Sequence, residues 1–73
     1  MVQVELEMQI YVNGSPAELE DNTPMSLLIE RLGLTGQRIA VEVNSELVPR
    51  SRFEAHALRE GDRVEIIHAV GGG

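Results

Sequence analysis

Apolar and polar residues alternate at the start of the chain. The even-numbered positions of residues 2–12 are all apolar, whereas the odd-numbered positions between them are Gln, Glu or Tyr. This period of two is typical of a strand with one buried face. Asn13-Gly14 follows at once and suits a two-residue turn, because such a turn needs positive φ angles. We therefore predict a hairpin whose second strand runs from Ser15 to Asp21.

The next segment has the pattern of an amphipathic helix. Met25, Leu28 and Leu32 recur at the i, i+3 and i+7 spacing that places side chains on one helix face. Thr23 is predicted as the N-cap, ahead of a proline that suits the first helical position. Gly33 is predicted to end the helix.

Further strand patterns follow the helix. Residues 38–43 (RIAVEV) alternate again, and Asn44-Ser45 turns the chain into the short apolar pair Leu47-Val48. Pro49 stops strand pairing, and the polar stretch after it has room for one helical turn. Beyond another glycine-containing turn, residues 63–70 (RVEIIHAV) form the last strand.

The order of these elements predicts an α+β fold. One main helix packs on one face of a mixed sheet of four to five strands. The first and last strands are long and apolar, so we place them side by side and parallel at the centre, joined by right-handed crossovers. This arrangement is a β-grasp, or ubiquitin-like, fold. It predicts a single domain over residues 1–69 and a flexible glycine tail over residues 70–73.

Composition excludes several classes of function. The chain of 73 residues has no Cys, so it offers no disulfide, thiolate metal site or sulfur nucleophile. A net charge of −6 has the wrong sign for binding a phosphate backbone, so nucleic acid is not an expected partner. No stretch approaches the roughly 20 apolar residues of a membrane span, and no export signal is visible. We expect a cytoplasmic protein that does not bind membranes.

The residue types that usually carry catalysis do not occur in a pattern typical of an active site. His56 and His68 are the only histidines, and their spacing without Cys gives no support for a metal site. Glu60 and Asp62 flank a turn glycine and are interpreted as solvated turn residues instead of a general acid and base. No glycine-rich loop lies between a strand and a helix start, so no phosphate cradle is predicted. We expect no enzyme activity and no cofactor bound by the chain itself.

The chain ends in three consecutive glycines. On their own, such glycines are most simply a disordered end. However, glycine has no Cβ, so it leaves a terminal carbonyl open to attack and lets the backbone pass through a narrow channel. Residues 70–73 span about 13 Å when extended, which is enough to reach a buried active site from a docked domain.

The C-terminal half, residues 43–73, resembles the ThiS family of small ubiquitin-like sulfur carriers of thiamin thiazole synthesis. The resemblance extends upstream through residues 11–34 and covers about residues 8–73. It rests on a combination in the family's order and approximate spacing: Val43-Asn44, Leu47-Val48-Pro49-Arg50, Gly61-Asp62 and the terminal glycines. Phe53 stands where the family often has Trp and keeps an aromatic side chain there. Residues 1–7 precede the family's usual start and either lengthen the first strand or form a mobile segment.

The resemblance implies a carrier whose tail is modified by partner enzymes. An adenylating enzyme of the ubiquitin-activating type would use ATP to activate the carboxylate of Gly73. A persulfide-bearing donor of the cysteine desulfurase type would then displace AMP and leave a thiocarboxylate, which thiazole synthase would receive. Val70, Gly71 and Gly72 would thread into the partners' active sites. The free carrier is expected to be a monomer.

Two alternatives to this function remain open. A related carrier would use the same tail chemistry for molybdopterin, cysteine or methionine synthesis, and a ubiquitin-like docking module would bind a partner without being activated. Tyr11, Ile67 and Ala69 lie out of phase with the core and predict an apolar patch on the open face of the sheet, which is either a docking surface or ordinary exposed apolar area. Arg50 either pairs with acidic groups of a partner or fixes the loop after Pro49.

Overall fold

The computed structural model describes residues 7–69. Its elements, in chain order, are β1 Glu7–Val12, β2 Ser15–Glu20, α1 Met25–Arg31, β3 Ile39–Val43, β4 Glu46–Val48, the 3₁₀ helix η1 Arg50–Arg52 and β5 Arg63–His68. The predictions for residues 1–6 and 70–73 lie outside the described residues. No helix within residues 7–69 is both long and apolar enough to span a membrane.

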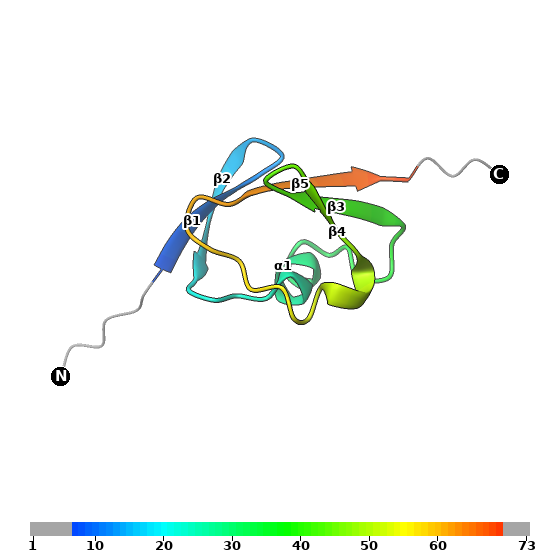
Figure 1. The fold of residues 1–73 in the computed structure, drawn as a ribbon, viewed down its shortest axis with the longest axis horizontal. Coiled ribbons are helices and arrows are strands. Elements are labelled where there is room, and N and C mark those ends of the chain that lie inside the picture. Colours follow the sequence, from blue (N-terminus) through cyan, green and yellow to red (C-terminus); the bar gives the residue numbers. More distant parts are fainter. Residues whose placement is uncertain (1–6, 70–73) are drawn as a thin grey trace.

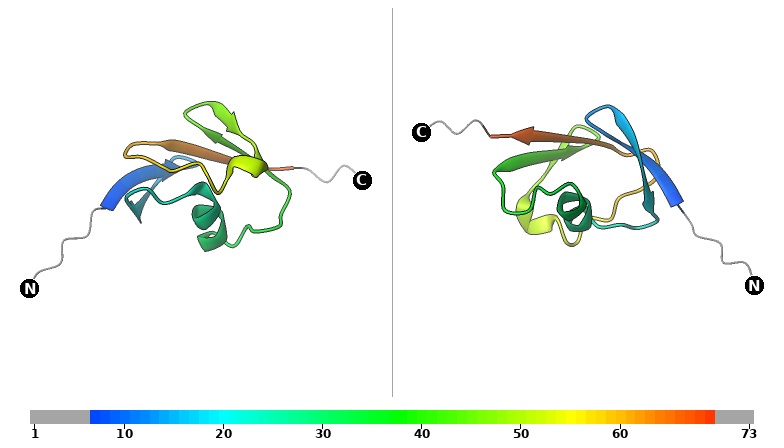
Figure 2. Two further views of the ribbon diagram at one scale, coloured as in Figure 1. Left: turned by 60° about the horizontal axis from the view of Figure 1, so that its bottom comes forward. Right: turned by 180° about the vertical axis from the view of Figure 1, so that it is seen from behind.

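The strands form one sheet in the order β2-β1-β5-β3-β4 (Figure 1). The central strands β1 and β5 are parallel, and the other neighbouring pairs are antiparallel. Helix α1 lies against one face of this sheet, as the two further views in Figure 2 show. The structure thus confirms the predicted β-grasp arrangement, with five strands.

The hairpin between β1 and β2 follows directly from the sequence. Asn13 and Gly14 adopt φ angles of 50° and 87°, and Val12 pairs with Ser15 across the turn. Such a pair of positive φ angles matches the right-handed twist of the flanking strands. Met8 and Ile10 are buried while the residues between them are exposed, so the alternation is confirmed over the described part of this strand.

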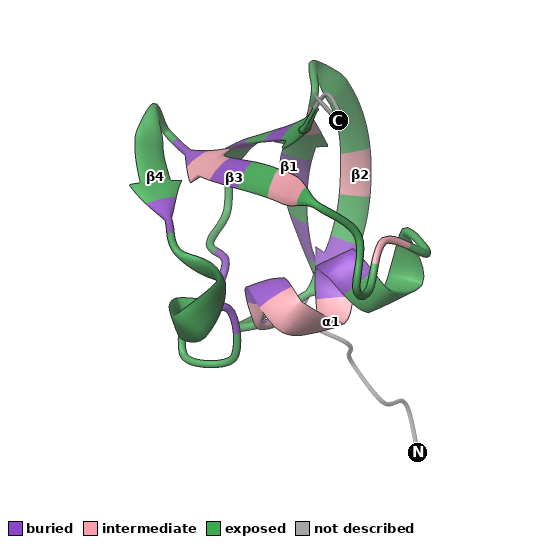
Figure 3. Cartoon of the chain, turned by 90° about the vertical axis from the view of Figure 1, so that its right-hand side faces the viewer, coloured by how far each residue is buried: buried purple, intermediate pink, exposed green. Residues whose placement is uncertain are grey.

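The core lies between the sheet and α1 (Figure 3). Its buried apolar residues are Met8, Ile10, Leu19, Met25, Leu28, Ile29, Val41, Val43, Val48, Phe53, Leu58, Val64 and Ile66. Two of them, Phe53 and Leu58, come from the long connection between β4 and β5. Leu58 is fully buried, although its segment has no periodic pattern that would predict a core position.

The predicted N-cap of the helix was wrong. Pro24 occupies the N-cap position with extended backbone angles, and no side chain caps the helix. Thr23 instead points back, and its hydroxyl donates a hydrogen bond of 2.6 Å to the carbonyl oxygen of Glu20. The first helical N–H groups, those of Met25 and Ser26, donate to backbone carbonyls of the β4–β5 connection. A distant segment therefore satisfies the donors that a cap residue would otherwise satisfy.

The far end of the helix differs from the prediction in one residue. Gly33 has a φ of 74°, as expected for a glycine that ends a helix. Leu32, predicted to continue the buried face, is instead the C-cap and is 44% exposed. The helix ends at Arg31, so the i+7 position falls beyond the last turn that faces the sheet.

Candidate functional site

The predicted tail follows the C-terminal end of β5 in the chain. This strand lies at the centre of the sheet, and its last residue, His68, is level with Ile39 at the start of β3 (Figure 1). The backbone N–H of Ala69 donates a hydrogen bond of 2.9 Å to the carbonyl oxygen of Arg38, just ahead of β3. Val70, Gly71, Gly72 and Gly73, the predicted tail residues, lie outside the described part of the chain. The described part of the chain therefore ends at the end of the sheet where β3 begins.

The predicted apolar residues of the open face are exposed. Tyr11 is 36% exposed and Ile67 is 51% exposed, and Ala69 is exposed beyond the end of β5. Val64 and Ile66 of the same strand are buried, so the predicted phase of β5 is confirmed.

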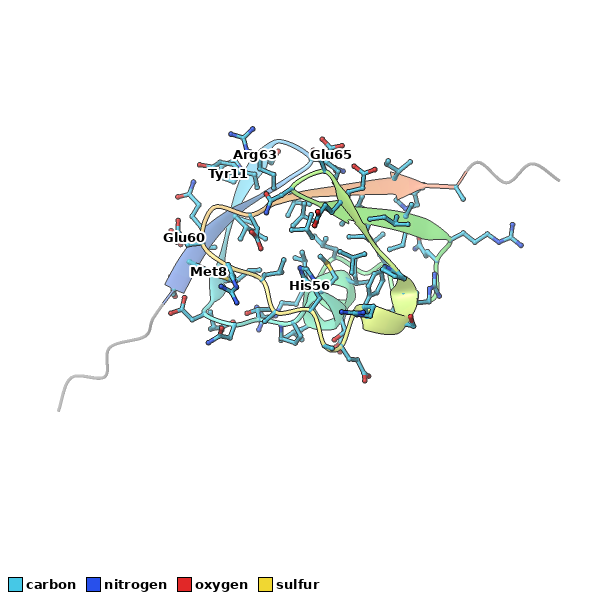
Figure 4. The ribbon with its side chains drawn as sticks, viewed as in Figure 1. Met8, Tyr11, His56, Glu60, Arg63 and Glu65 are labelled. Carbon is cyan, nitrogen blue, oxygen red and sulfur yellow. The ribbon has the colours of Figure 1, made fainter. Side chains whose placement is uncertain are left out.

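These residues do not form one patch. Tyr11 pairs with Arg63 at the start of β5, and Figure 4 shows both side chains, with Glu65, on the side of the sheet away from α1. Ile67 lies four residues further along this strand, about 13 Å away. Its neighbour across the sheet is the exposed Ala40 of β3, which the sequence did not single out.

We use the name open-face patch for Ala40, Ile67 and Ala69, which gather at the tail end of the sheet. Leu47 of β4 is also exposed, at 66%, but it lies on the edge strand opposite Glu42. Glu42 in turn lies directly opposite Glu65. Glu42 therefore lies between Leu47 and the central strand β5, and Glu65 of β5 faces it, which limits the apolar patch to the end nearest the tail.

Arg50 has the structural role that the sequence left open as one of two alternatives. Its guanidinium Nη2 donates a hydrogen bond of 2.6 Å to the carbonyl oxygen of Gln37, in the loop between α1 and β3. The side-chain Oε1 of Gln37 lies 3.1 Å from Nε2 of His68, at the end of β5. These contacts connect η1, the α1–β3 loop and the strand from which the tail leaves. No sequence pattern marks Gln37, since its role depends on contacts between distant segments.

The carboxylates at the glycine turn also have structural roles. Glu60 Oε1 accepts a hydrogen bond of 3.0 Å from the backbone N–H of Gln9. Asp62 accepts hydrogen bonds from the side-chain amide of Asn44 and from the backbone N–H of Arg59. Both carboxylates thus hold the turn in place, so they are more than solvated residues, and their positions suit structure and not acid–base chemistry.

The two histidines lie in unrelated surroundings. His68 is exposed at the end of β5, as predicted for a strand residue facing solvent. His56 is half-buried in the β4–β5 connection, and its carbonyl oxygen accepts the N–H of Met25 (Figure 4). Within residues 7–69 no three His, Cys, Asp or Glu side chains gather in a way that would hold a metal ion.

Comparison with known proteins identifies the family. The model of the ThiS family matches residues 10–73. The chain belongs to the ThiS family. A thiamine biosynthesis protein (ThiS) from Geobacter metallireducens, known from a crystal structure, is 30% identical in sequence to this chain. The two structures match with a TM-score of 0.78 over 90% of this chain and 100% of that one. This match confirms the resemblance to the family and the β-grasp fold.

Two curated relatives of this ThiS-family chain carry informative names. The thiazole synthase of Magnetococcus marinus is 38% identical over 90% of this chain, and the chain spans only 20% of the length of that relative. The sulfur carrier protein ThiS of Escherichia coli is 26% identical over 90% of this chain and 100% of its own length. A segment like this chain therefore occurs both as a small protein and as a part of a longer one.

Proposed function

We propose that this chain is a sulfur carrier of thiamin biosynthesis, and that the carboxylate of Gly73 is the group that carries the sulfur. The observation that carries the proposal is the match of the ThiS family through to the last glycine, residue 73. The position of Ala69 supports it, because residues 70–73 follow directly after a residue that lies at one end of the sheet. The domain then serves as the part that partners recognise.

The terminal carboxylate must be activated before sulfur can replace its oxygen. A carboxylate oxygen attacks the α-phosphorus of ATP, pyrophosphate leaves, and an acyl-adenylate forms on Gly73. The terminal sulfur of a protein persulfide then attacks the carbonyl carbon, and AMP leaves with the electron pair of the broken C–O bond. A thiol cleaves the S–S bond of the resulting acyl disulfide, which leaves the thiocarboxylate and a disulfide. The persulfide and the thiol must come from partner proteins, because this chain contains no Cys.

Thiazole synthase is the proposed acceptor of the sulfur. The thiazole synthases of Magnetococcus marinus and Paramagnetospirillum magneticum each contain a segment that is similar to 90% of this chain and makes up 20% of their own length. When a carrier and its acceptor are joined in one polypeptide, delivery becomes intramolecular and the effective concentration rises. This arrangement favours thiazole synthesis over molybdopterin, cysteine or methionine synthesis as the pathway served.

The open-face patch is the proposed recognition surface for these partners. Ile67 of β5 and Ala40 of β3 are paired neighbours on adjacent strands, close to the last described residue, Ala69. An exposed apolar side chain of this size, 51% accessible for Ile67, loses water-exposed area when a partner covers it. A partner docked there would hold the first residue of the tail at a fixed distance from its active site.

Intact mass spectrometry tests the proposed function. The chain is incubated with ATP, an adenylating enzyme from the same genome and a persulfide donor with reducing thiol. We expect a gain equal to the mass difference between sulfur and oxygen, located on the C-terminal peptide. A chain that lacks Gly73 is the matched control and should gain nothing. Full partner binding with no mass gain in the intact chain would contradict the carrier function and favour a docking module.

A further inference from the structure

The end of β5 is held from one side of the sheet. On the side of β1, the contacts within residues 7–69 reach as far as Ile66, through the side chain of Asn13. Beyond Ile66, β5 pairs with β3 alone. The backbone N–H of Ala69 then donates a hydrogen bond of 2.9 Å to the carbonyl oxygen of Arg38, just ahead of β3. The position of Ala69 therefore depends on the segment that leads into β3.

Arg50 holds that segment through a carbonyl oxygen. Its Nη2 donates a hydrogen bond of 2.6 Å to the carbonyl oxygen of Gln37. Because a peptide group is planar, a bond that fixes the C=O of Gln37 also fixes the N–H of Arg38. The carbonyl oxygen of Arg38 is in turn the acceptor for Ala69. Arg50 thus contacts the residue immediately before that acceptor.

A second contact joins the same loop residue to β5. The side-chain Oε1 of Gln37 lies 3.1 Å from Nε2 of His68, within hydrogen-bond distance. His68 lies opposite Ile39 in the register of β3 and β5, so this contact is next to the backbone bond of Ala69. Gln37 is therefore held by Arg50 through its main chain and contacts the end of β5 through its side chain.

The backbone of Arg50 is tied to the core. Arg50 begins η1 directly after Pro49, whose ring restricts φ, here −66°. Phe53, the C-cap of η1, is buried, and its N–H donates to the carbonyl oxygen of Arg50 at 3.1 Å. The carbonyl oxygen of Phe53 accepts the N–H of Ser26 in the first turn of α1. The side chain of Arg50 therefore extends from a well-supported turn to a loop at the surface.

We propose that Arg50 is a positioning residue for the tail. Through Gln37 it holds His68 and Ala69, and with them the point from which residues 70–73 extend into an active site. Glycine residues give a segment of up to about 13 Å many conformations. A fixed starting point raises the fraction of them in which the carboxylate of Gly73 meets the α-phosphorus of ATP. The contacts stand on the geometry alone, whereas their effect on activation rests on the proposed sulfur-carrier function.

Amide exchange tests the positioning in the free chain. The exchange rate of the Ala69 N–H is measured by NMR on the ¹⁵N-labelled full chain. Arg50→Met keeps an unbranched apolar stem but has no donor for Gln37, so the rate should rise about fivefold, the effect of one hydrogen bond. Arg50→Lys should stay close to the wild type, because a single nitrogen of Arg50 makes the bond and an ammonium can replace it.

Two controls separate a local effect from a general loss of stability. Arg52→Met should leave the rate at Ala69 unchanged, since Arg52 lies in the same 3₁₀ helix but lines a hollow beside Glu46 of β4. The amide of Val41, a fully buried residue of β3, should keep its rate in Arg50→Met. Equal acceleration at Val41 and Ala69 would mean that Arg50 stabilises the whole domain and has no particular role at the end of β5.

A double-mutant cycle tests whether the two contacts of Gln37 act together. Gln37→Met keeps the carbonyl that Arg50 binds and removes the Oε1 that contacts His68. Since both contacts hold the same end of β5, the double variant should accelerate exchange at Ala69 by less than the product of the single effects. A full product would show that Arg50 and the Gln37 side chain act independently, contrary to the proposal.

The activation step provides a readout that general stability would not move. Pyrophosphate release by an adenylating enzyme from the same genome is measured at varied chain concentrations, with a persulfide donor and thiol present. Arg50→Met should lower kcat about fivefold and change KM by less than about twofold, because docking is kept while the tail is placed correctly less often. Arg50→Lys should restore kcat, and Arg52→Met should keep both constants.

Three outcomes would overturn the proposal. Unchanged exchange at Ala69 in Arg50→Met would show that Arg50 does not hold the strand end. Faster exchange with unchanged kcat would show that activation does not need a fixed strand end. A raised KM with unchanged kcat in both Arg50→Met and Arg50→Lys would show that Arg50 binds the partner directly.

The failure of the proposed function would look different. In that case the wild type would show neither pyrophosphate release nor sulfur gain, while Arg50→Met would still show faster exchange at Ala69. That combination would refute the carrier function and leave the contacts of Arg50 with the end of β5 intact.

Discussion

Asn13 binds both backbone groups of Ile66. Its side-chain Oδ1 accepts a hydrogen bond of 2.8 Å from the N–H of Ile66, and its Nδ2 donates one of 3.3 Å to the carbonyl oxygen of the same residue. β1 pairs with β5 only at Tyr11 and Val12. Beyond Val12, the side chain of the turn residue Asn13 forms the hydrogen bonds to β5. One side chain of the hairpin turn thereby extends the ladder along the strand that leads to the tail.

Replacing Asn13 should destabilise the domain without changing the turn. Asn13→Gly keeps access to the observed φ of 50° but removes both hydrogen bonds to Ile66. We expect the free energy of unfolding to fall by about 1–2 kcal/mol, measured by urea denaturation. Asn22→Gly is the control, since Asn22 also has a positive φ, of 64°, and lies in another turn. Equal losses in the two variants would show that the side-chain bonds to β5 contribute nothing.

Leu58 should be the most sensitive position of the β4–β5 connection. It is fully buried, and its backbone N–H donates to the carbonyl oxygen of Thr23 at 2.9 Å. Leu58→Ala leaves a cavity and should lower the free energy of unfolding by about 2–5 kcal/mol. Leu47→Ala, at a leucine that is 66% exposed, should change it by less than about 0.5 kcal/mol. Thermal and urea unfolding curves check both values, and a small loss in Leu58→Ala would mean that this connection is not part of the core.

The facing carboxylates of β3 and β5 should weaken the fold slightly. Glu42 and Glu65 lie directly opposite each other, and like charges in that position are destabilising. Glu65→Gln should raise the free energy of unfolding by about 0.2–1 kcal/mol in low salt. The gain should shrink in ~1 M NaCl, where charges are screened over about 3 Å.

A glutamate of β2 supplies the control for this effect. Glu18 of β2 lies opposite the uncharged Gln9, so Glu18→Gln removes a charge but no facing pair. Its unfolding free energy should stay close to that of the wild type at both salt concentrations. A gain in Glu65→Gln that is the same in low and high salt would show that the repulsion between the two carboxylates is not its cause.

The open-face patch should decide affinity for the tail-binding partner. Ile67→Glu places a charge in the middle of the patch and should raise the dissociation constant of the complex with the adenylating enzyme about tenfold or more. Because Ile67 is 51% exposed, the free domain should keep its stability. Isothermal titration calorimetry measures the affinity.

Leu47→Glu is the matched control for this surface. Leu47 is exposed on the same sheet, but it lies on the edge strand β4, away from the end of β5. The same apolar-to-acidic change there should leave affinity unchanged. Equal weakening in both variants would point to the overall negative charge of the chain as the cause and would contradict docking through Ile67.

Local patterns predicted most of the secondary structure because their causes are local. The Asn13-Gly14 turn needs positive φ angles that its own residues supply, and the alternation along β1 and β5 reflects one buried and one exposed face. The short helix was likewise visible in the spacing of Met25 and Leu28, and its end in Gly33. The central parallel pair followed from topology rules that leave few arrangements for this order of elements.

The sequence by itself determined the fold class and the family, since these depend on periodicity, motif order and residue type. Only the tertiary structure decided which distant groups meet. It replaced the expected cap of Thr23 with carbonyls of the β4–β5 connection, buried Leu58, and joined Arg50 to Gln37 beside His68. It also divided the predicted apolar patch, because Tyr11 lies opposite Arg63 while Ile67 lies opposite Ala40. Such contacts join segments far apart in the chain, so no local pattern records them.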